Sequence, residues 1–185
     1  MKILGGRHKN FSIPFRPSPF LRPTPDKVRS AIMEVLGAKI EGAAVLDLFS
    51  GTGALGLEAL SRGARRVVFV EKHRPLCARL ERCLKEWGEK AETGSVWCGS
   101  AESALKRLAA QKELFDLVLA DPPYEQGWGR SLVENPALSE LLASGGIAVI
   151  ETYKTEGFPE RAGDLIRVKS SVYGDTAVTY YRKGT

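Results

Sequence analysis

Three acidic residues stand at the ends of short apolar runs, where they could act together in chemistry. Asp47 lies near the end of the run AAVLDLF, Glu71 ends the run RVVFVE, and Asp121 ends the run FDLVLAD. Such runs are typical of buried parallel strands, and an α/β sheet binds ligands just beyond the carboxyl ends of its strands. We therefore expect the three carboxylates to lie in one crevice.

A glycine-rich loop follows the first of these runs. Gly51, Gly53 and Gly56 have the GxGxxG spacing of a nucleotide-binding loop, although glycines also serve simply to turn a chain. A P-loop is excluded, because leucine and glutamate stand where lysine and a hydroxyl residue must follow the last glycine. The spacing leaves two ligand classes, the NAD(P) dinucleotides and S-adenosylmethionine.

The charge of Asp47 separates these two ligands. A dinucleotide would place its pyrophosphate over the helix N-terminus beside the Asp47 carboxylate, which is unfavourable. S-adenosylmethionine would bring a sulfonium and an ammonium group, which a carboxylate complements. Asp47 could instead cap a local turn. Glu71 offers two oxygens to ribose hydroxyls in either class, so the pattern as a whole favours the methyl donor.

The rest of the expected cofactor site comes from the same loop and from the third predicted strand. Gly99, Ser100 and Ala101 follow that strand and could lie against an adenine ring. The residues that we expect to bind the cofactor are Asp47, Phe49, Gly51, Thr52, Gly53, Glu71, Ser100, Ala101 and Asp121.

The four residues after the fourth predicted strand, Asp121, Pro122, Pro123 and Tyr124, are expected to be catalytic. Two consecutive prolines fix their φ angles and donate no backbone hydrogen bond, so this turn is stiff. The Asp121 carboxylate and the Pro122 carbonyl could each accept one N–H of an exocyclic amino group and aim its lone pair at a sulfonium methyl group. Tyr124 could stack on a flipped base. A rigid loop whose tyrosine fills the core is the alternative.

The elements that position these residues alternate between strand and helix patterns, which predicts a doubly wound, Rossmann-like α/β sheet. The predicted parallel strands are 43–49, 66–71, 95–100, 115–121 and 146–152. The predicted helices between them are 54–62, 75–87, 101–111 and 130–143. The end differs, because two β-rich runs, 165–173 and 176–182, flank a Gly-Asp pair typical of a hairpin turn. We expect a mostly parallel sheet with a C-terminal antiparallel hairpin.

Residues 24–37 are predicted to form a further helix that packs on the main domain. Thr24 can cap it, Pro25 suits its first position, and Gly37 suits the left-handed position at its end. Arg29 is predicted to face away from the apolar stripe of this helix. That stripe consists of Val28, Ala31, Ile32, Val35 and Leu36.

The first 25 residues carry the whole net charge of +5, because they hold five basic residues and no carboxylate. Such an arm could grip a polyanion, or it could be a solvated tail. The residues that we expect to contact a nucleic acid are Arg7, Lys9, Arg16, Arg22 and Arg29.

The composition is that of a globular protein, with 43% hydrophobic and 26% charged residues among 185. No apolar stretch approaches the roughly 18 residues of a membrane-spanning helix, and no signal peptide is recognisable, so we expect a cytoplasmic protein. Cys77, Cys83 and Cys98 lack metal spacing and are interpreted as reduced packing thiols. The isolated His8 and His73 imply no metal site.

With these residues in view, the chain resembles the class I S-adenosylmethionine-dependent methyltransferases that modify exocyclic amino groups, where (D/N)PP(Y/F) is the signature. More narrowly, it resembles the bacterial 16S ribosomal RNA guanine-N2 methyltransferase family. The resemblance covers nearly the whole chain, through the segments GGRHKNFSIPF, RPTPDKVRSAIMEVL, DLFSGTGALGLEALSRGA and DPPY.

The resemblance implies that the chain methylates the N2 amino group of one guanine, with 16S rRNA or an assembling small subunit as partner. It implies that Asp47, Gly51 and Gly53 hold the methionine part of the cofactor and that Glu71 holds the ribose. Residues 121–124 match the catalytic loop.

The N-terminal motif and two departures from the family pattern also matter. Arg22, Thr24 and Arg29 match a motif that in the family borders the cofactor and RNA side. Asn10 stands where the family often has glycine, and Ser100 stands where an acidic or amide residue commonly meets the adenine amino group.

Two other functions remain compatible with the sequence. One is an amino-methyltransferase of another substrate, such as adenine N6 in DNA or RNA, or a protein glutamine. The other is a nucleotide-binding or RNA-binding module without activity. In the favoured interpretation, residues 1–37 form a basic arm and capping helix, residues 38–185 form a class I methyltransferase domain, and a monomer is the favoured oligomeric state.

Overall fold

The computed structural model describes residues 1–13, 24–123 and 127–184. The helices are α1 (Asp26–Leu36), the 3-10 helix η1 (Gly37–Ile40), α2 (Ala54–Ser61), α3 (Arg74–Glu86), α4 (Ala101–Ala110), α5 (Trp128–Glu134) and α6 (Pro136–Leu141). The strands are β1 (Ala44–Leu48), β2 (Arg66–Glu71), β3 (Gly94–Cys98), β4 (Phe115–Ala120), β5 (Leu142–Tyr153), β6 (Arg161–Ala162), β7 (Leu165–Tyr173) and β8 (Thr176–Lys183).

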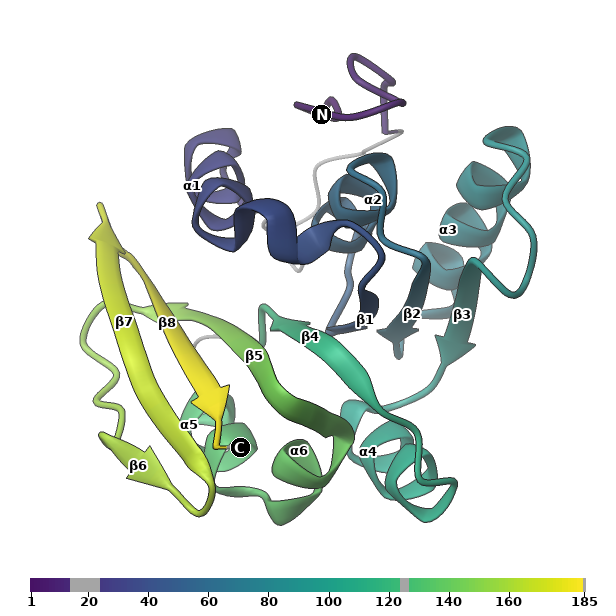
Figure 1. Cartoon of the computed structure of the whole chain (residues 1–185). Coiled ribbons are helices and arrows are strands. Elements are labelled where there is room, and N and C mark those ends of the chain that lie inside the picture. The colour runs from purple at the N-terminus through teal and green to yellow at the C-terminus, as the bar shows by residue number, and fades with distance from the viewer. Residues whose placement is uncertain (14–23, 124–126, 185) are drawn as a thin grey trace.

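The strands form one sheet in the order β3-β2-β1-β4-β5-β8-β7-β6 (Figure 1). The first five strands along the chain are parallel, while β8 pairs antiparallel with both β5 and β7. Parallel strands need crossover helices, and these helices cover both faces of the sheet. The predicted fold class, including the C-terminal hairpin, is confirmed.

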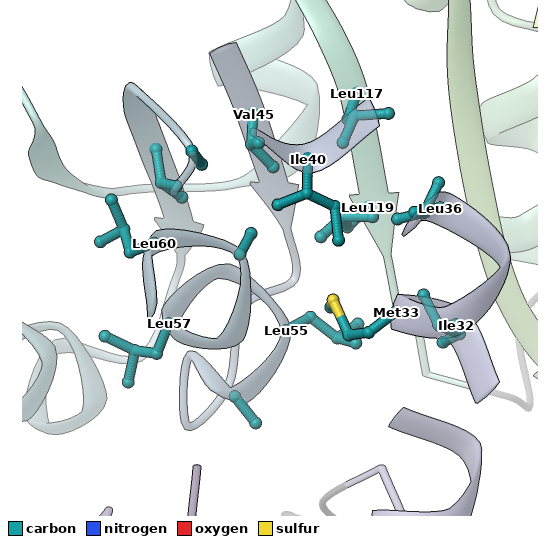
Figure 2. Close-up of a cluster of buried hydrophobic side chains, with 14 of the residues drawn as sticks. Ile32, Met33, Leu36, Ile40, Val45, Leu55, Leu57, Leu60, Leu117 and Leu119 are labelled. Carbon is teal, nitrogen blue, oxygen red and sulfur yellow. The ribbon is translucent and has the colours of Figure 1, made fainter. Parts of the chain in front are cut away.

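Two apolar layers lie on opposite faces of the sheet. Residues of α1, α2 and α3 pack with alternate residues of the strands, such as Val45 and Leu119, on one face. Residues of α4, α5 and α6 pack with the intervening strand residues, such as Leu46 and Val118, on the other. Figure 2 shows how α1 contributes Met33 beside α2 and β1. The helix after the basic arm therefore shares the main core, as expected.

The first residues of the chain form a small hairpin docked on α2. A bridge pairs Lys2 with Ser12, and both oxygens of the buried Glu58 carboxylate accept the Leu4 N–H, at 3.1 and 2.9 Å. Asn10 adopts a φ of 70°, a left-handed conformation that asparagine tolerates far better than most residues. The part of the basic arm that the structure describes is therefore attached to the domain.

The start of α1 differs from the prediction. Pro25 is the N-cap residue, and no side chain caps the helix. Thr24 does not cap it, because its hydroxyl group donates to the Asp121 carboxylate instead. Gly37 ends the helix with a φ of 51°, as expected. The sequence pattern thus located the helix but misassigned its capping residue.

The prediction of a single helix over residues 130–143 was also wrong. The chain forms α5 and α6, which meet at Asn135 and Pro136. Pro136 has no N–H and suits a helix start, while the Asn135 side chain accepts the Ala137 N–H at 3.0 Å. These two residues therefore begin a new helix. The prediction also missed η1 and β6, and it began β5 at residue 146 rather than at Leu142.

The cysteines occupy three different environments. Burial raises the pKa of the Cys77 thiol to about 12 and that of the Cys83 thiol to about 11. The Cys77 Sγ lies 3.2 Å from the Glu71 carbonyl oxygen and 2.7 Å from the Cys98 Sγ. Cys98 itself is exposed, so the interpretation of all three as packing thiols was wrong for this residue.

Iodoacetamide at pH 8 is expected to label one thiol of the folded protein quickly, at Cys98, because only the exposed thiolate can react. Cys77 and Cys83 should react only after denaturation. Intact-mass and peptide mass spectrometry would count and locate the labels, and Cys98→Ser should abolish rapid labelling. Fast labelling of Cys83 in the native protein would contradict the described core.

Candidate cofactor and catalytic site

The register of three neighbouring strands brings the predicted site residues to one edge of the sheet. The last residues that pair across β2, β1 and β4 are Val70, Leu48 and Ala120. The residues that follow these three in the sequence are Glu71, Phe49 and Asp121, respectively. Because adjacent strands lie about 4.8 Å apart, the backbones of Glu71 and Asp121 are separated by roughly 10 Å. This span is shorter than a nucleoside cofactor.

The loop after β1 has the strained backbone expected of a ligand-binding turn. Phe49, Gly51 and Gly53 have φ angles of 57°, 54° and 77°. Glycine adopts this conformation freely, but a phenylalanine there is strained by about 1 kcal/mol or more, and such residues concentrate at functional sites. Helix α2 begins directly after Gly53, so the N–H groups of its first turn, which have no partner within the helix, lie at the loop.

Asp47 is buried beneath this loop and braces it. Asp47 is 2% exposed, and its Oδ2 accepts the Gly56 N–H at 3.0 Å. A β-carbon at position 56 would lie 2.8 Å from that oxygen and 2.3 Å from the Phe69 ring, so only glycine allows this approach. Burial raises the pKa of Asp47 to about 7, opposed by the Gly56 hydrogen bond and reinforced by the nearby Glu71 charge.

Glu71 braces the same loop from β2. Its Oε2 accepts the Gly51 N–H and its Oε1 accepts the His73 N–H, both at 2.8 Å. A carboxylate has about four lone-pair positions, so each oxygen can still accept a second hydrogen bond. The contact of Glu71 with a ribose stays a prediction.

Asp47 and Glu71 together leave negative charge that the fold does not neutralise. Within the described ranges, neither carboxylate lies in an ion pair with a basic side chain; each binds backbone N–H groups instead. A buried pair of acids without a basic partner is unfavourable unless a proton or a cation is supplied. These acidic acceptors therefore fit the ammonium and sulfonium groups of S-adenosylmethionine and do not fit a pyrophosphate.

An aromatic pair borders the expected adenine region. Phe49 and Trp128 meet edge to face with their ring centroids 5.9 Å apart, and with Ala101 they line a cavity of about 40 Å³. Ser100 is not among the residues that line this cavity, and its hydroxyl accepts the Ser103 N–H and caps α4. Sequence reasoning missed Trp128, although an aromatic residue soon after the catalytic turn was the available signal.

The turn that is expected to be catalytic, residues 121–124, is described up to Pro123. Asp121 is half-buried, Pro122 is buried and Pro123 is exposed. The Thr24 hydroxyl donates to Asp121 Oδ2 at 3.0 Å, a contact between residues 97 positions apart that no local pattern announces. Tyr124 lies outside the described residues. The catalytic roles of these residues stay predictions.

The residues predicted to bind RNA do not share one environment. Arg7 is half-exposed and forms an ion pair with Glu89, Lys9 is exposed, and Arg16 and Arg22 lie outside the described residues. Of these four residues, only Lys9 and the outer part of Arg7 are therefore placed by the described structure to meet a polyanion.

The prediction that Arg29 contacts RNA is wrong, because its side chain is fully buried. Its guanidinium group donates to the Lys2 carbonyl at 2.7 Å and to the Asp26 carboxylate at 3.0 Å. A buried charge needs such partners, and a backbone carbonyl in a distant hairpin is one that helical periodicity cannot reveal. Arg29 therefore ties the start of α1 to the N-terminal hairpin.

Comparison with known proteins gives a consistent result. A family model described as conserved hypothetical protein 95 matches residues 1–182. Ribosomal RNA small subunit methyltransferase D of Escherichia coli (strain K12) is 29% identical over 187 residues, which cover 99% of this chain and 90% of that protein. The Bacillus subtilis protein YlbH is 32% identical over 183 residues, or 99% of each chain.

Solved structures resemble the fold over nearly its whole length. The Escherichia coli protein yhhF superposes with a TM-score of 0.82 at 30% identity, covering 100% of this chain and 98% of that one. An RNA methyltransferase from Salinibacter ruber in complex with S-adenosyl-L-homocysteine gives a TM-score of 0.65 at 21% identity, covering 88% and 94%. The second likeness is one of fold alone.

No helix in the described ranges is long and apolar enough to cross a membrane.

Proposed function

The chain belongs to the family described as conserved hypothetical protein 95, and from this premise we propose that it methylates the exocyclic N2 amino group of a guanine in 16S ribosomal RNA. S-adenosylmethionine is the cofactor and rRNA methylation is the reaction class. We further propose that the methyl group goes to the N2 position and to a single guanine. A ribosomal RNA substrate also favours a cytoplasmic location.

One observation carries the proposal: the uncompensated acidic pair beneath the glycine-rich loop lies on the same edge of the sheet as Asp121, with Asp47 one strand away and Glu71 two strands away. Asp47 and Glu71 would hold the ammonium and ribose ends of the cofactor. When bound, S-adenosylmethionine supplies an electrophilic methyl group on a positively charged sulfur. The crevice then has a place for a cation and, beside it, an acceptor for an amine.

Asp121 and Pro122 would prepare the amino group for this transfer. An exocyclic amine is a poor nucleophile because its lone pair is delocalised into the ring. An acceptor at Asp121 and another at the Pro122 carbonyl would orient the two N–H bonds and free the lone pair toward the methyl carbon. Overall, an amino group and S-adenosylmethionine become a methylamino group, S-adenosylhomocysteine and one proton.

The N-terminal hairpin is the proposed RNA-binding element of the described chain. Its exposed Lys9 and the outer part of Arg7 could meet phosphates, while Arg29 supports the hairpin from within. Phosphate contacts position a substrate, whereas RNA sites are chosen by loop shape. We therefore expect the hairpin to affect the KM for RNA rather than the chemistry.

Mass spectrometry of 16S rRNA nucleosides from a strain lacking the gene tests the proposal. One N2-methylguanosine should disappear, and the wild-type gene should restore it. The purified protein should then methylate unmodified 16S rRNA or small-subunit particles, and not DNA or glutamine-containing peptides. An unchanged guanine methylation pattern in the deletion strain would contradict the proposal.

A further inference from the structure

The hydrogen bond between Thr24 and Asp121 joins the N-terminal segment to the catalytic turn. The Thr24 hydroxyl donates to Oδ2 of Asp121 over 3.0 Å. Thr24 is 6% exposed, although it lies outside every helix and strand of the described chain. A buried hydroxyl outside regular structure that reaches the expected amine acceptor suggests a role in the reaction rather than in local folding.

The surroundings of Thr24 hold its hydroxyl in a fixed place. Pro25, the next residue, has a restricted φ of −56° and is the N-cap residue of α1. One turn later, Arg29 ties this end of the helix to Asp26 and to the Lys2 carbonyl. The helix then packs in the core shared with α2 and β1 (Figure 2). Thr24 is therefore presented by a rigid support.

A fixed hydroxyl would solve a specific problem for the Asp121 carboxylate. The terminal torsion of an aspartate side chain has a broad energy minimum, so hydrogen bonds decide where its two oxygens point. A hydrogen bond from a hydroxyl to a charged oxygen is among the stronger neutral-to-ion contacts. Holding Oδ2 in this way fixes the plane of the carboxylate and leaves the direction of Oδ1 defined.

We propose that Thr24 is a positioning residue for methyl transfer, whose hydroxyl holds Asp121 Oδ2 so that Oδ1 can accept an N–H of the substrate amine. This inference rests on the proposed function, because it needs the amine at Asp121. Thr24 itself does not touch the reacting atoms. This positioning role explains why the segment before α1 and the catalytic turn, which are remote in sequence, meet at a hydroxyl and a carboxylate.

Two substitutions separate orientation from folding. Thr24→Val keeps the shape of the side chain and removes the donor, and it should lower kcat by roughly tenfold to a hundredfold, the value of one hydrogen bond to a charged group. The KM for RNA and the Kd for S-adenosylmethionine should stay within about twofold. Thr24→Ser keeps the donor and should restore kcat to near the wild-type value.

A matched control comes from helix α1, which begins two residues after Thr24. Ser30 donates to Glu34 at 3.3 Å in an exposed position, so Ser30→Ala also removes one side-chain hydroxyl from this segment. It should leave kcat unchanged. Steady-state methyl transfer from labelled S-adenosylmethionine to unmodified 16S rRNA or small-subunit particles gives kcat and the KM for RNA, and calorimetry gives the Kd for S-adenosylmethionine.

The outcomes separate this inference from the proposed function. An active wild-type enzyme with unchanged kcat in Thr24→Val would overturn the inference alone. So would equal losses in the valine and serine variants, or a loss that falls on the KM for RNA. A wild-type protein that methylates no RNA would overturn the proposed function and the inference with it. A kcat that falls in Thr24→Val and returns in Thr24→Ser, with unchanged affinity for S-adenosylmethionine, would support both the inference and the proposed function.

Discussion

Asp121→Ala is expected to lower kcat for RNA methylation by roughly a hundredfold to a thousandfold, the usual effect of removing one preorganised polar contact to a reacting group. Cofactor affinity should change by less than about threefold, because the described contacts of the cofactor loop come from Asp47 and Glu71 rather than from Asp121. A loss in kcat with retained binding marks a contact made mainly in the transition state.

Asp121→Asn and Asp164→Ala complete this experiment. Asparagine retains one acceptor oxygen and should give an intermediate kcat. Asp164 is an exposed aspartate in the turn between β6 and β7, so its replacement should change nothing. Methyl incorporation into RNA and calorimetric titration with S-adenosylmethionine measure the two parameters. An Asp121→Ala enzyme that keeps more than a tenth of its kcat would remove Asp121 from the proposed mechanism.

Asp47→Asn is expected to weaken S-adenosylmethionine binding by roughly tenfold to a hundredfold, since one charged partner of the cofactor is lost. The same change should make the ligand-free protein more stable. Asparagine can still accept the Gly56 N–H, but it removes a carboxylate that burial and the Glu71 charge destabilise. Lower affinity together with higher stability is typical of a group kept for binding.

The pH dependence of this effect follows from the raised pKa of Asp47, about 7 in the folded chain. Between an unfolded pKa of about 3.9 and the folded value, the native state binds more protons than the unfolded state, so this group's contribution to unfolding free energy falls as pH rises. The Tm difference between Asp47→Asn and wild type should therefore be larger at pH 8 than at pH 5. An equal difference at both values would contradict the buried charge.

The strand-end residues could be predicted because their positions depend on local patterns. Apolar runs located β1, β2 and β4, and parallel strands bring their carboxyl ends to one edge, so Glu71 and Asp121 followed from the sequence. The glycine spacing likewise predicted the turn into α2. The resemblance added the substrate, which neither spacing nor periodicity could supply.

The errors arose where distant segments decide the environment of a residue. Arg29 was placed on the surface because a charged residue ordinarily faces solvent, yet its partner carbonyl belongs to Lys2 in the hairpin. Thr24 looked like a helix cap because its partner, Asp121, is 97 positions away. The burial of Asp47 beneath its own loop was equally invisible. The break at Pro136 was a local signal that the periodicity of the flanking residues concealed.

Calorimetric titration of S-adenosylmethionine at pH 6.5, in two buffers with different heats of ionisation, tests the central claim most directly. At this pH the Asp47 carboxyl is largely protonated in the free protein, so binding of a cationic ligand should release a fraction of one proton. Asp47→Asn should bind more weakly and release none. Absence of S-adenosylmethionine binding, or binding without proton release by the wild-type protein, would contradict a site whose acidic pair awaits a cation.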